Sequence, residues 1–403
     1  MFFSKVKSFI SGKKGITLLS FLGLYFLSTS VSWAIFSYLL TEPDFSFNGS
    51  KDPRSQIADL PKTQECPING EMYTEPEREI WETRRPIAAI IENNAASRPP
   101  SGLSKADVVY ESVAEGGITR FVVIYYCGAA AENIDIAPVR SARVYHIDWA
   151  SEYGDKPIFM HVGGANDYGG FGDTVKEAKA LELLTTLGWR VAGGNDFDTT
   201  YDSGFPIFWR NYERLDKKVA TEHTMMASLD AAYKEAEKRG FSYKDKNGNS
   251  WDSGFVKWSF ADGKPLSSPK ATEISFEFWE GGLFSKEYSV TWNYDPETNG
   301  YLRENGGAKH MDLETGSQIS AKNVVVMFTE QKGPVDRNMH ILYTTVGEGK
   351  TLIFQNGGVI EGTWEKTSRT ARTRFFEKDG KEIDFVRGQI WIEILPKNNK
   401  VNY

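Results

Sequence analysis

The chain has 403 residues, more than one hydrophobic core usually holds, so its length predicts two domains. Hydrophobic residues make up 40% and charged residues 25% of it, the composition of an ordinary globular protein. The formal net charge is −7 at pH 7, whereas a protein that binds nucleic acid normally presents a basic surface. The composition therefore argues against a nucleic-acid partner and leaves enzymes and binding proteins open.

The first 40 residues differ from the rest of the chain. Residues 1–14 carry four lysines and no acid, and residues 15–40 carry no charge at all. As a helix, the uncharged stretch would reach roughly 39 Å, enough for a bilayer core of roughly 30 Å. We predict a cytoplasmic basic tail (1–14) and a single transmembrane anchor (15–40), with the remainder outside the cytoplasm. A signal peptide cleaved after Ser32-Trp33-Ala34 is the alternative, and it also exports the rest.

Export has consequences for the charge and for the two cysteines. Removing the +4 of the tail from −7 leaves −11 on the remainder, which argues against general binding of anionic polymers. No cysteine follows the apolar run in a lipid-attachment context, which argues against a lipoprotein. Cys66 and Cys127 either pair in the oxidising exterior or, alternatively, Cys127 is a small buried hydrophobic residue.

Beyond the anchor, the patterns divide the chain into a linker and two domains. Residues 41–84 are rich in Pro, Asn, Gly and charge, which predicts an extracytoplasmic linker. Residues 85–245 alternate apolar strand patterns with helical patterns at 173–188 and 223–240, which predicts an α/β domain. Residues 255–397 contain short strand patterns about every ten residues, which predicts a mostly antiparallel all-β domain. The predicted fold class is thus α+β, preceded by one transmembrane helix.

Strong catalytic signatures are absent from the sequence. It contains no HExxH, no GxSxG and no P-loop, and its five histidines are scattered. We therefore predict neither a metal nor a cofactor.

Polar residues gather instead where the strands of the first domain end and its loops begin, which is where ligands bind in open α/β sheets. The pattern "PVRSAR" is one such place, because arginines three apart after a proline could clamp an anion. We expect Arg140 and Arg143 to line a pocket beside Glu92, Glu111 and Arg120. The full set of candidate ligand-binding residues is Glu92, Arg98, Arg120, Arg140, Ser141, Arg143, Asn166 and His223.

Two carboxylates on one predicted strand suggest a catalytic alternative. Glu111 and Glu115 are an even number of residues apart and so would face the same side of a regular strand. Such a pair could serve as acid and base in glycoside hydrolysis, with His161 at the end of the next strand pattern. The competing interpretation is that each glutamate pairs with an arginine in a structural network.

Several long motifs resemble the YerB-like family of bacterial exported proteins: "RPIAAIIENNAASRPPSGLSKADVVYESVAEGGITRF", "APVRSAR", "GEGKTLIFQNGGVIEGTWEK" and "EKDGKEIDFVRGQIWIEILP". The resemblance spans about residues 86–396. It implies a bacterial, envelope-associated protein of two domains, without an established activity. The chain lacks the lipid-accepting cysteine of that family, and it has His223-Thr224 where relatives have a His-Asn pair.

These observations lead to two functional hypotheses. The first is a membrane-anchored envelope protein that binds a wall polymer such as peptidoglycan, or an envelope protein partner. The second is a cell-wall glycan hydrolase that uses Glu111 or Glu115 with His161. In both, Arg140 and Arg143 would hold a carboxylate or phosphate, the groups that arginine forks match.

Overall fold

The computed structural model describes residues 20–32, 53–167, 172–282 and 284–403. Residues 20–32 form a helix, and the chain divides into two units, residues 1–51 and 52–403. Within the described residues, no helix is both long enough and apolar enough to cross a membrane. The predicted tail (1–14), both ends of the predicted anchor and the start of the predicted linker lie outside the described residues.

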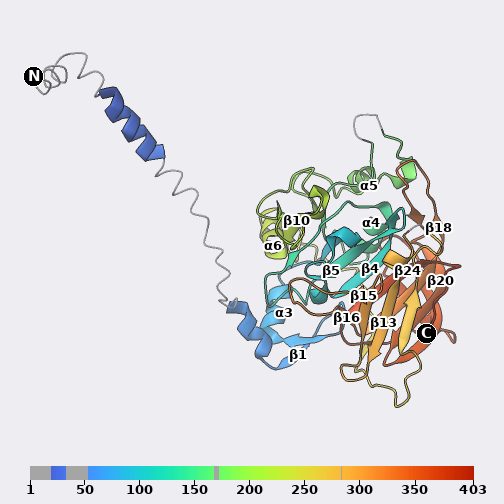
Figure 1. Cartoon of the computed structure of the whole chain (residues 1–403). Helices are drawn as coiled ribbons and strands as arrows, with labels where there is room; N and C mark the ends of the chain where they lie inside the picture. Colours follow the sequence, from blue (N-terminus) through green and yellow to red (C-terminus); the bar gives the residue numbers. More distant parts are fainter. Residues whose placement is uncertain (1–19, 33–52, 168–171, 283) are drawn as a thin grey trace, which may run out of the picture. The chain divides into compact units, whose positions relative to one another are not determined.

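A mixed sheet of ten strands runs through the unit of residues 52–403 (Figure 1). Its order is β22-β21-β20-β17-β24-β4-β5-β3-β7-β8. The first half of the chain supplies β3 (Ile87–Glu92), β4 (Val108–Glu115), β5 (Ile118–Tyr125), β7 (Ile158–His161) and β8 (Asp196–Asp198). The second half supplies β17 (Asn323–Thr329), β20 (Gly347–Gln355), β21 (Gly358–Lys366), β22 (Arg374–Glu377) and β24 (Ile390–Pro396). The central strands are almost continuously apolar, as strands covered on both faces must be.

The two predicted domains meet inside this sheet. Strand β24 pairs in parallel with β4, so Glu393 lies opposite Glu111 and the sheet continues from one domain into the other. Strand β24 is also parallel to β17, whereas most strand pairs of the β-rich half are antiparallel, as predicted. The α+β class is confirmed. The continuity of the sheet was not foreseen, because pairing between strands some 280 positions apart leaves no local pattern.

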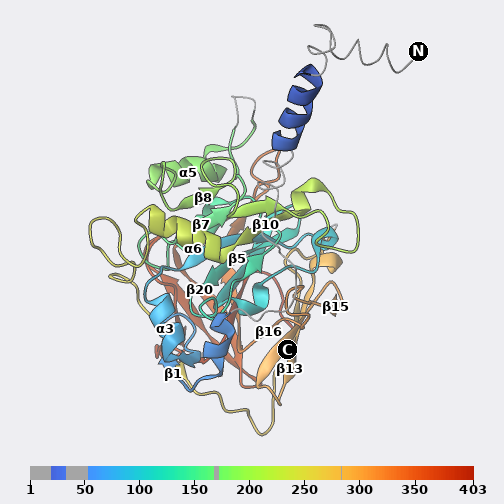
Figure 2. The same ribbon diagram turned by 90° about the vertical axis from the view of Figure 1, so that its left-hand side faces the viewer.

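Helices and a small sheet cover one face of β3, β4 and β5 (Figure 2). They are α4 (Val144–Ala150), α5 (Ala180–Thr186), α6 (Leu229–Lys238) and the sheet of β6 (Asp135–Ile136), β10 (Met225–Ser228) and β9 (Phe208–Arg210). Both predicted helices are shorter than their apolar patterns. Residues Met225–Ser228 form β10, and the hydroxyl of Ser228 accepts the backbone N–H of Ala231 to begin α6 only there.

A second sheet packs on the opposite face of the large sheet (Figure 1). It contains β12 (Glu273–Phe276), β13 (Val290–Asp295), β14 (Gly300–Asn305), β15 (Ala308–Lys309) and β16 (Ser320–Ala321). The Trp292 ring of β13 meets the Trp391 ring of β24 edge to face, with centroids 5.3 Å apart. Two short pairs complete the strands: β11 (Phe260–Ala261) with β23 (Phe385–Val386), and β18 (Gln331–Lys332) with β19 (Leu342–Tyr343).

The predicted linker, residues 41–84, is wrong from Pro53 onward. This part folds into a 3-10 helix (Pro53–Asp59), β1 (Lys62–Glu65), β2 (Met72–Thr74) and α3 (Glu75–Trp81). Thr74 and Glu77 form a capping box that starts α3, and Trp81 at its end is buried. Proline, glycine and charge dominate the composition here, and the few residues that enter the core are too widely spaced to show a period.

A disulfide joins Cys66 to Cys127 at the end of β5, so the pairing alternative for the cysteines is correct. The buried Asp107 carboxylate lies next to it and accepts backbone N–H groups of Tyr126, Cys127 and Gly128. Burial raises the pKa of Asp107 to about 7, although these hydrogen bonds act in the opposite direction. The disulfide and this carboxylate together tie the start of the folded unit to the end of β5.

Candidate functional site

The large sheet places charged side chains from several strands at one edge. Strands β3, β7 and β8 are parallel, and β5 runs antiparallel to both β3 and β4. The C-terminal ends of β3, β4, β7 and β8 and the start of β5 therefore meet at the same edge. The "PVRSAR" loop crosses this edge, because Arg140 N–H bonds the Ile90 carbonyl and Ala142 N–H bonds the Gly163 carbonyl.

The two glutamates of β4 do not face the same side, contrary to the expectation from their spacing. The register between β4 and β5 shifts between Val113 and Glu115, which marks a β-bulge. Before the bulge, Glu111 lies opposite Phe121. After it, Glu115 lies opposite Ile118, on the face of Arg120. One inserted residue changes the phase of the alternation, so Glu111 and Glu115 belong to different clusters.

Glu115 holds two buried arginines on the face covered by α4. Arg120 Nη2 lies 2.9 Å from Glu115 Oε2, and Arg143 forms an ion pair with the other oxygen. Arg120 also donates to the backbone carbonyl of Ser141, and Arg143 donates to that of Ala142. Burial lowers the pKa of Arg143 to about 10, so it remains charged at neutral pH. Glu115, Arg120 and Arg143 thus brace the loop that carries Arg140.

Glu92 organises the neighbouring cluster, which is closer to solvent. Its Oε1 accepts a hydrogen bond from Arg140 Nε at 3.0 Å, and its Oε2 lies 2.7 Å from His223 Nδ1. Glu92 is only 3% exposed, whereas the side chain of Arg140 is 27% exposed. Among the described residues, no hydrogen-bond acceptor meets the two terminal nitrogens of Arg140. Arg210, which is exposed, lies nearby, because its Nη1 donates to the backbone carbonyl of Thr221 in the 3-10 turn that carries His223.

Glu111 lies in a sealed cluster on the opposite face. It is fully buried, forms an ion pair with the equally buried Arg303, and accepts hydrogen bonds from Asn93 (3.0 Å) and Thr119 (2.6 Å). Arg98 also belongs to this side, where its Nε donates to Asn93 Oδ1. A substrate cannot reach the Glu111 carboxylate unless the contact between the two sheets opens. The geometry favours the structural role over a catalytic one for this residue.

The buried Glu393 makes this cluster sensitive to pH. Burial raises the pKa of Glu393 well above its ordinary value of 4.5, and the neighbouring charge of Glu111 adds to the effect. The folded protein therefore keeps a proton that the unfolded chain loses above about pH 4.5. The stability that this retained proton contributes is full below that pH and is lost as the pH rises through the folded-state pKa.

We expect Glu393→Gln to flatten the fall in unfolding free energy with rising pH above about pH 4.5, because the amide does not titrate. Urea denaturation of both proteins across this pH range gives the measurement. Identical slopes in both proteins would contradict the assignment.

His161 and Asn166 do not belong to any of these three clusters. His161 is fully buried, with Nε2 2.5 Å from Asp196 and Nδ1 2.7 Å from the Gly163 carbonyl. Burial disfavours the charged imidazolium, but Asp196 outweighs it and raises the pKa of His161. Asn166 lines a shallow cavity of about 400 Å³ with Arg190, which itself binds Asp196. His161 is thus held in an ion-pair network rather than presented to a ligand.

Sequence reasoning missed several residues that complete these clusters. His340 forms a backbone bridge with Glu115, and its ring bonds Asp336 at 2.8 Å, which brings the C-terminal half of the chain to the edge of the site. Arg303 and Glu393 complete the cluster of Glu111. A single acid inside the apolar run "QIWIEILP" is the signal that could have indicated Glu393 as a buried charge. No comparable signal distinguishes Asp336 or His340.

The part of the chain that the structure describes contains no group of three side chains that is free to bind a metal ion. The one group of three potential ligands there is Cys66, Asp107 and Cys127. The two sulfurs are bonded to each other, so neither is available as a thiolate.

Comparison with known proteins assigns this chain to a family. The models of the two domains of a protein family of unknown function, DUF3048, match residues 70–242 (N-terminal domain) and 282–392 (C-terminal domain). A protein of Bacillus subtilis (strain 168) described as "Putative lipoprotein YerB" is 28% identical over 349 residues, covering 85% of this chain and 89% of that protein. The crystal structure of YerB from Bacillus subtilis superposes with a TM-score of 0.65 at 26% identity, over 85% of this chain and all of that one. The chain therefore carries both domains of the DUF3048 family and belongs to it, which confirms the resemblance drawn from its sequence motifs.

Proposed function

We propose that this protein is an extracytoplasmic protein of the bacterial cell envelope that binds an anionic group of a wall polymer through Arg140. The observation that carries the proposal is the geometry of this arginine. Glu92 fixes its Nε, while neither terminal nitrogen has a hydrogen-bond acceptor among the described residues, and the side chain is partly exposed. A guanidinium held in this way presents a preformed fork for a carboxylate or a phosphate.

The surroundings of Arg140 support an anion as the ligand. Arg120 and Arg143 lie beneath the same loop and share the single carboxylate of Glu115. Arg210 adds an exposed positive charge close to His223, and the Glu222 carboxylate lies near both Arg210 and Arg140. Because the rest of the unit is acidic, this edge is locally less negative than the protein as a whole and would select anionic groups at short range.

The location outside the cytoplasm rests on three observations. The chain begins with a basic segment followed by an uncharged one. Its two cysteines are paired, as is usual in oxidising compartments. A homologous protein is described as a lipoprotein, although both cysteines of this chain are engaged in the disulfide and neither is free to accept a lipid. We propose that the apolar N-terminal segment takes the place of the lipid.

We expect Arg140→Gln to weaken binding to the wall polymer at least tenfold, because the amide has neither the charge nor the fork of the guanidinium. The measurement is co-sedimentation of the purified full chain with bacterial peptidoglycan, prepared with and without its attached phosphate-bearing polymers. Comparison of the two preparations shows whether carboxylates or phosphates are bound. Arg374→Gln is the matched control, since Arg374 pairs with Glu382 on the edge strand β22, far from the site along the sheet order.

The same experiment separates binding from hydrolysis. Equal sedimentation of wild type and Arg140→Gln would contradict the proposed site. Soluble glycan fragments released by the wild-type chain would instead support the hydrolase, and Glu115 would then be the remaining candidate acid, because Glu111 is sealed from solvent.

A further inference from the structure

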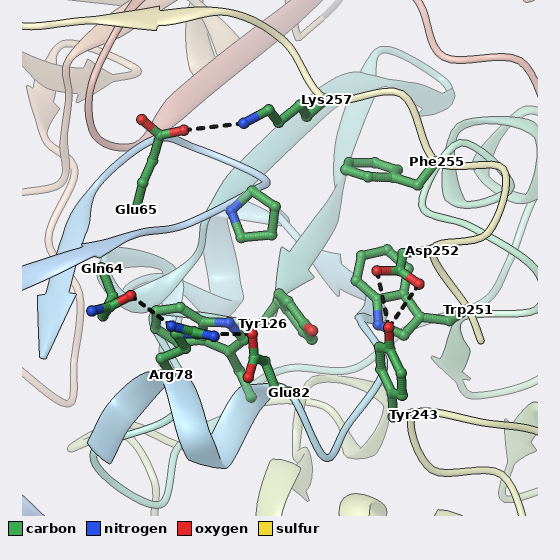
Figure 3. Close-up of a pocket in the computed structure, with 12 residues that line it drawn as sticks. Gln64, Glu65, Arg78, Glu82, Tyr126, Tyr243, Trp251, Asp252, Phe255 and Lys257 are labelled. Atoms are coloured by element: carbon green, nitrogen blue, oxygen red, sulfur yellow. Dashed lines mark hydrogen bonds and ion pairs between the residues drawn. The ribbon is translucent and has the colours of Figure 1, made fainter. Parts of the chain in front are cut away.

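A cavity of about 580 Å³ lies at the opposite end of β5 from Arg140 (Figure 3). Its walls come from β1 and Pro67, from α3 and Glu82 at its end, from Tyr126 and from the segment 243–257. Arg120 near the start of β5 and Tyr126 just after its end are six residues apart, or roughly 20 Å along a strand. The cavity is thus a separate site, of a volume usual for small-molecule pockets.

Aromatic rings form the inner wall of this cavity. Trp81, Tyr126 and Trp251 are each 2% exposed, and Tyr126 meets Trp251 edge to face with ring centroids 5.0 Å apart. Phe255 packs against Trp251 with centroids 5.3 Å apart and is half-buried, as is Tyr243. Phe255 also stacks on Tyr153, with centroids 6.3 Å apart, and Tyr243 packs against the same core. Of the aromatic rings that line the cavity, Phe255 and Tyr243 are the two that are partly exposed to an occupant.

Polar groups line the outer part of the cavity, and they are already paired with one another (Figure 3). Arg78 donates to Glu82 at 2.8 Å and to Gln64 at 3.0 Å. Tyr243 donates its hydroxyl to Asp252 at 3.1 Å, and Lys257 lies 3.5 Å from Glu65. Among these charged groups, Asp252 is the one with no ion-pair partner in the described residues, because the Tyr243 hydroxyl is neutral. Its carboxylate oxygens, like those of Glu82, can still accept hydrogen bonds from a neutral ligand.

The covalent framework makes this arrangement rigid. Cys66 stands between Glu65 and Pro67, which line the cavity, and its partner Cys127 follows Tyr126. The disulfide therefore fixes two of the lining segments relative to each other. A preformed pocket of this kind loses little conformational entropy when it binds a ligand.

We propose that this cavity binds an uncharged sugar ring of a glycan. The apolar C–H face of a sugar would stack on Phe255 and Tyr243, and its hydroxyl groups would donate to Asp252 and Glu82. The aromatic surfaces match the apolar face of such a ligand. The carboxylates, the arginine and the glutamine match its hydroxyl groups. The site is distinct from Arg140, so either proposal can fail without the other.

Saturation-transfer NMR on the purified full chain tests this site, with tetrasaccharides of N-acetylglucosamine and of glucose as probes at millimolar concentration. We expect transfer to at least one probe and a loss of fivefold or more in affinity for Phe255→Ala. Asp252→Asn removes a charged acceptor at an exposed position, so it should weaken binding without affecting folding. Tyr212→Ala, which removes an exposed aromatic ring outside the cavity, should bind as the wild type does.

Three results would overturn the sugar site. One is an absence of transfer to either probe in the folded wild type. Another is transfer that persists unchanged in Asp252→Asn and in Phe255→Ala. The third is binding of a lysine tetrapeptide, lost in Asp252→Asn, in place of both sugars, which would show that the aromatic rings and acids serve a cation instead.

Discussion

Replacing Glu111 with alanine is expected to lower the free energy of unfolding by about 3–5 kcal/mol, since it leaves a buried cation without its partner. That cation is Arg303, which is fully buried between the two sheets. Its guanidinium lies 4.9 Å from the ring centre of Trp391, and its Nη1 lies 2.6 Å from His310 Nδ1. Neither contact can replace a carboxylate. The remaining carboxyl group, that of Glu393, lies 3.7 Å from Arg303 Nε, and burial favours its uncharged form. Urea denaturation followed by circular dichroism gives the measurement.

Two further variants show whether the loss comes from the ion pair. Glu361→Ala, which breaks an exposed pair with Lys378, should change the free energy of unfolding far less than Glu111→Ala does. Glu111→Leu combined with Arg303→Met removes both charges and should be less destabilising than Glu111→Ala alone. A cost of Glu111→Ala no greater than that of the exposed control would contradict the structural assignment. It would also restore Glu111 as a candidate for catalysis.

Removing the disulfide should lower the free energy of unfolding by about 4 kcal/mol, the entropic value for closing a loop of this length. The two cysteines are 61 residues apart in the sequence. The double variant Cys66→Ser with Cys127→Ser and the chemically reduced wild type should show the same loss by urea denaturation. The sugar affinity of the cavity should fall as well, because Pro67 and Tyr126 line it next to the two cysteines.

Thiol trapping provides the control for this prediction. In whole cells, both cysteines should resist alkylation until the protein is reduced, as expected for a protein exported to an oxidising compartment. Alkylation of both without prior reduction would contradict the location outside the cytoplasm. An unfolding midpoint that does not change on reduction would show that Asp107 and its backbone hydrogen bonds hold the two segments without the disulfide.

The sequence by itself determined the fold class, the main strands of the large sheet and the edge at which polar residues gather. The strands of the first half are recognisable because each is an apolar run ended by polar residues, and this pattern is local. Glu92, Glu115, Arg120 and the arginines of "PVRSAR" follow or precede such runs, so their meeting at one edge could be expected from the parallel arrangement. Periodicity also identified the region of α6, although not its first residue.

Only the tertiary structure decided which of these residues can meet a ligand. A single-residue bulge separates Glu111 from Glu115, and its effect on side-chain direction is invisible in their spacing. The pairing of β24 with β4 buries Glu111 against a strand near the other end of the chain. Likewise, the cavity of Trp251 and Phe255 is assembled from segments that the disulfide and α3 bring together. Local patterns record what a segment must bury, whereas long-range pairing determines what it is buried against.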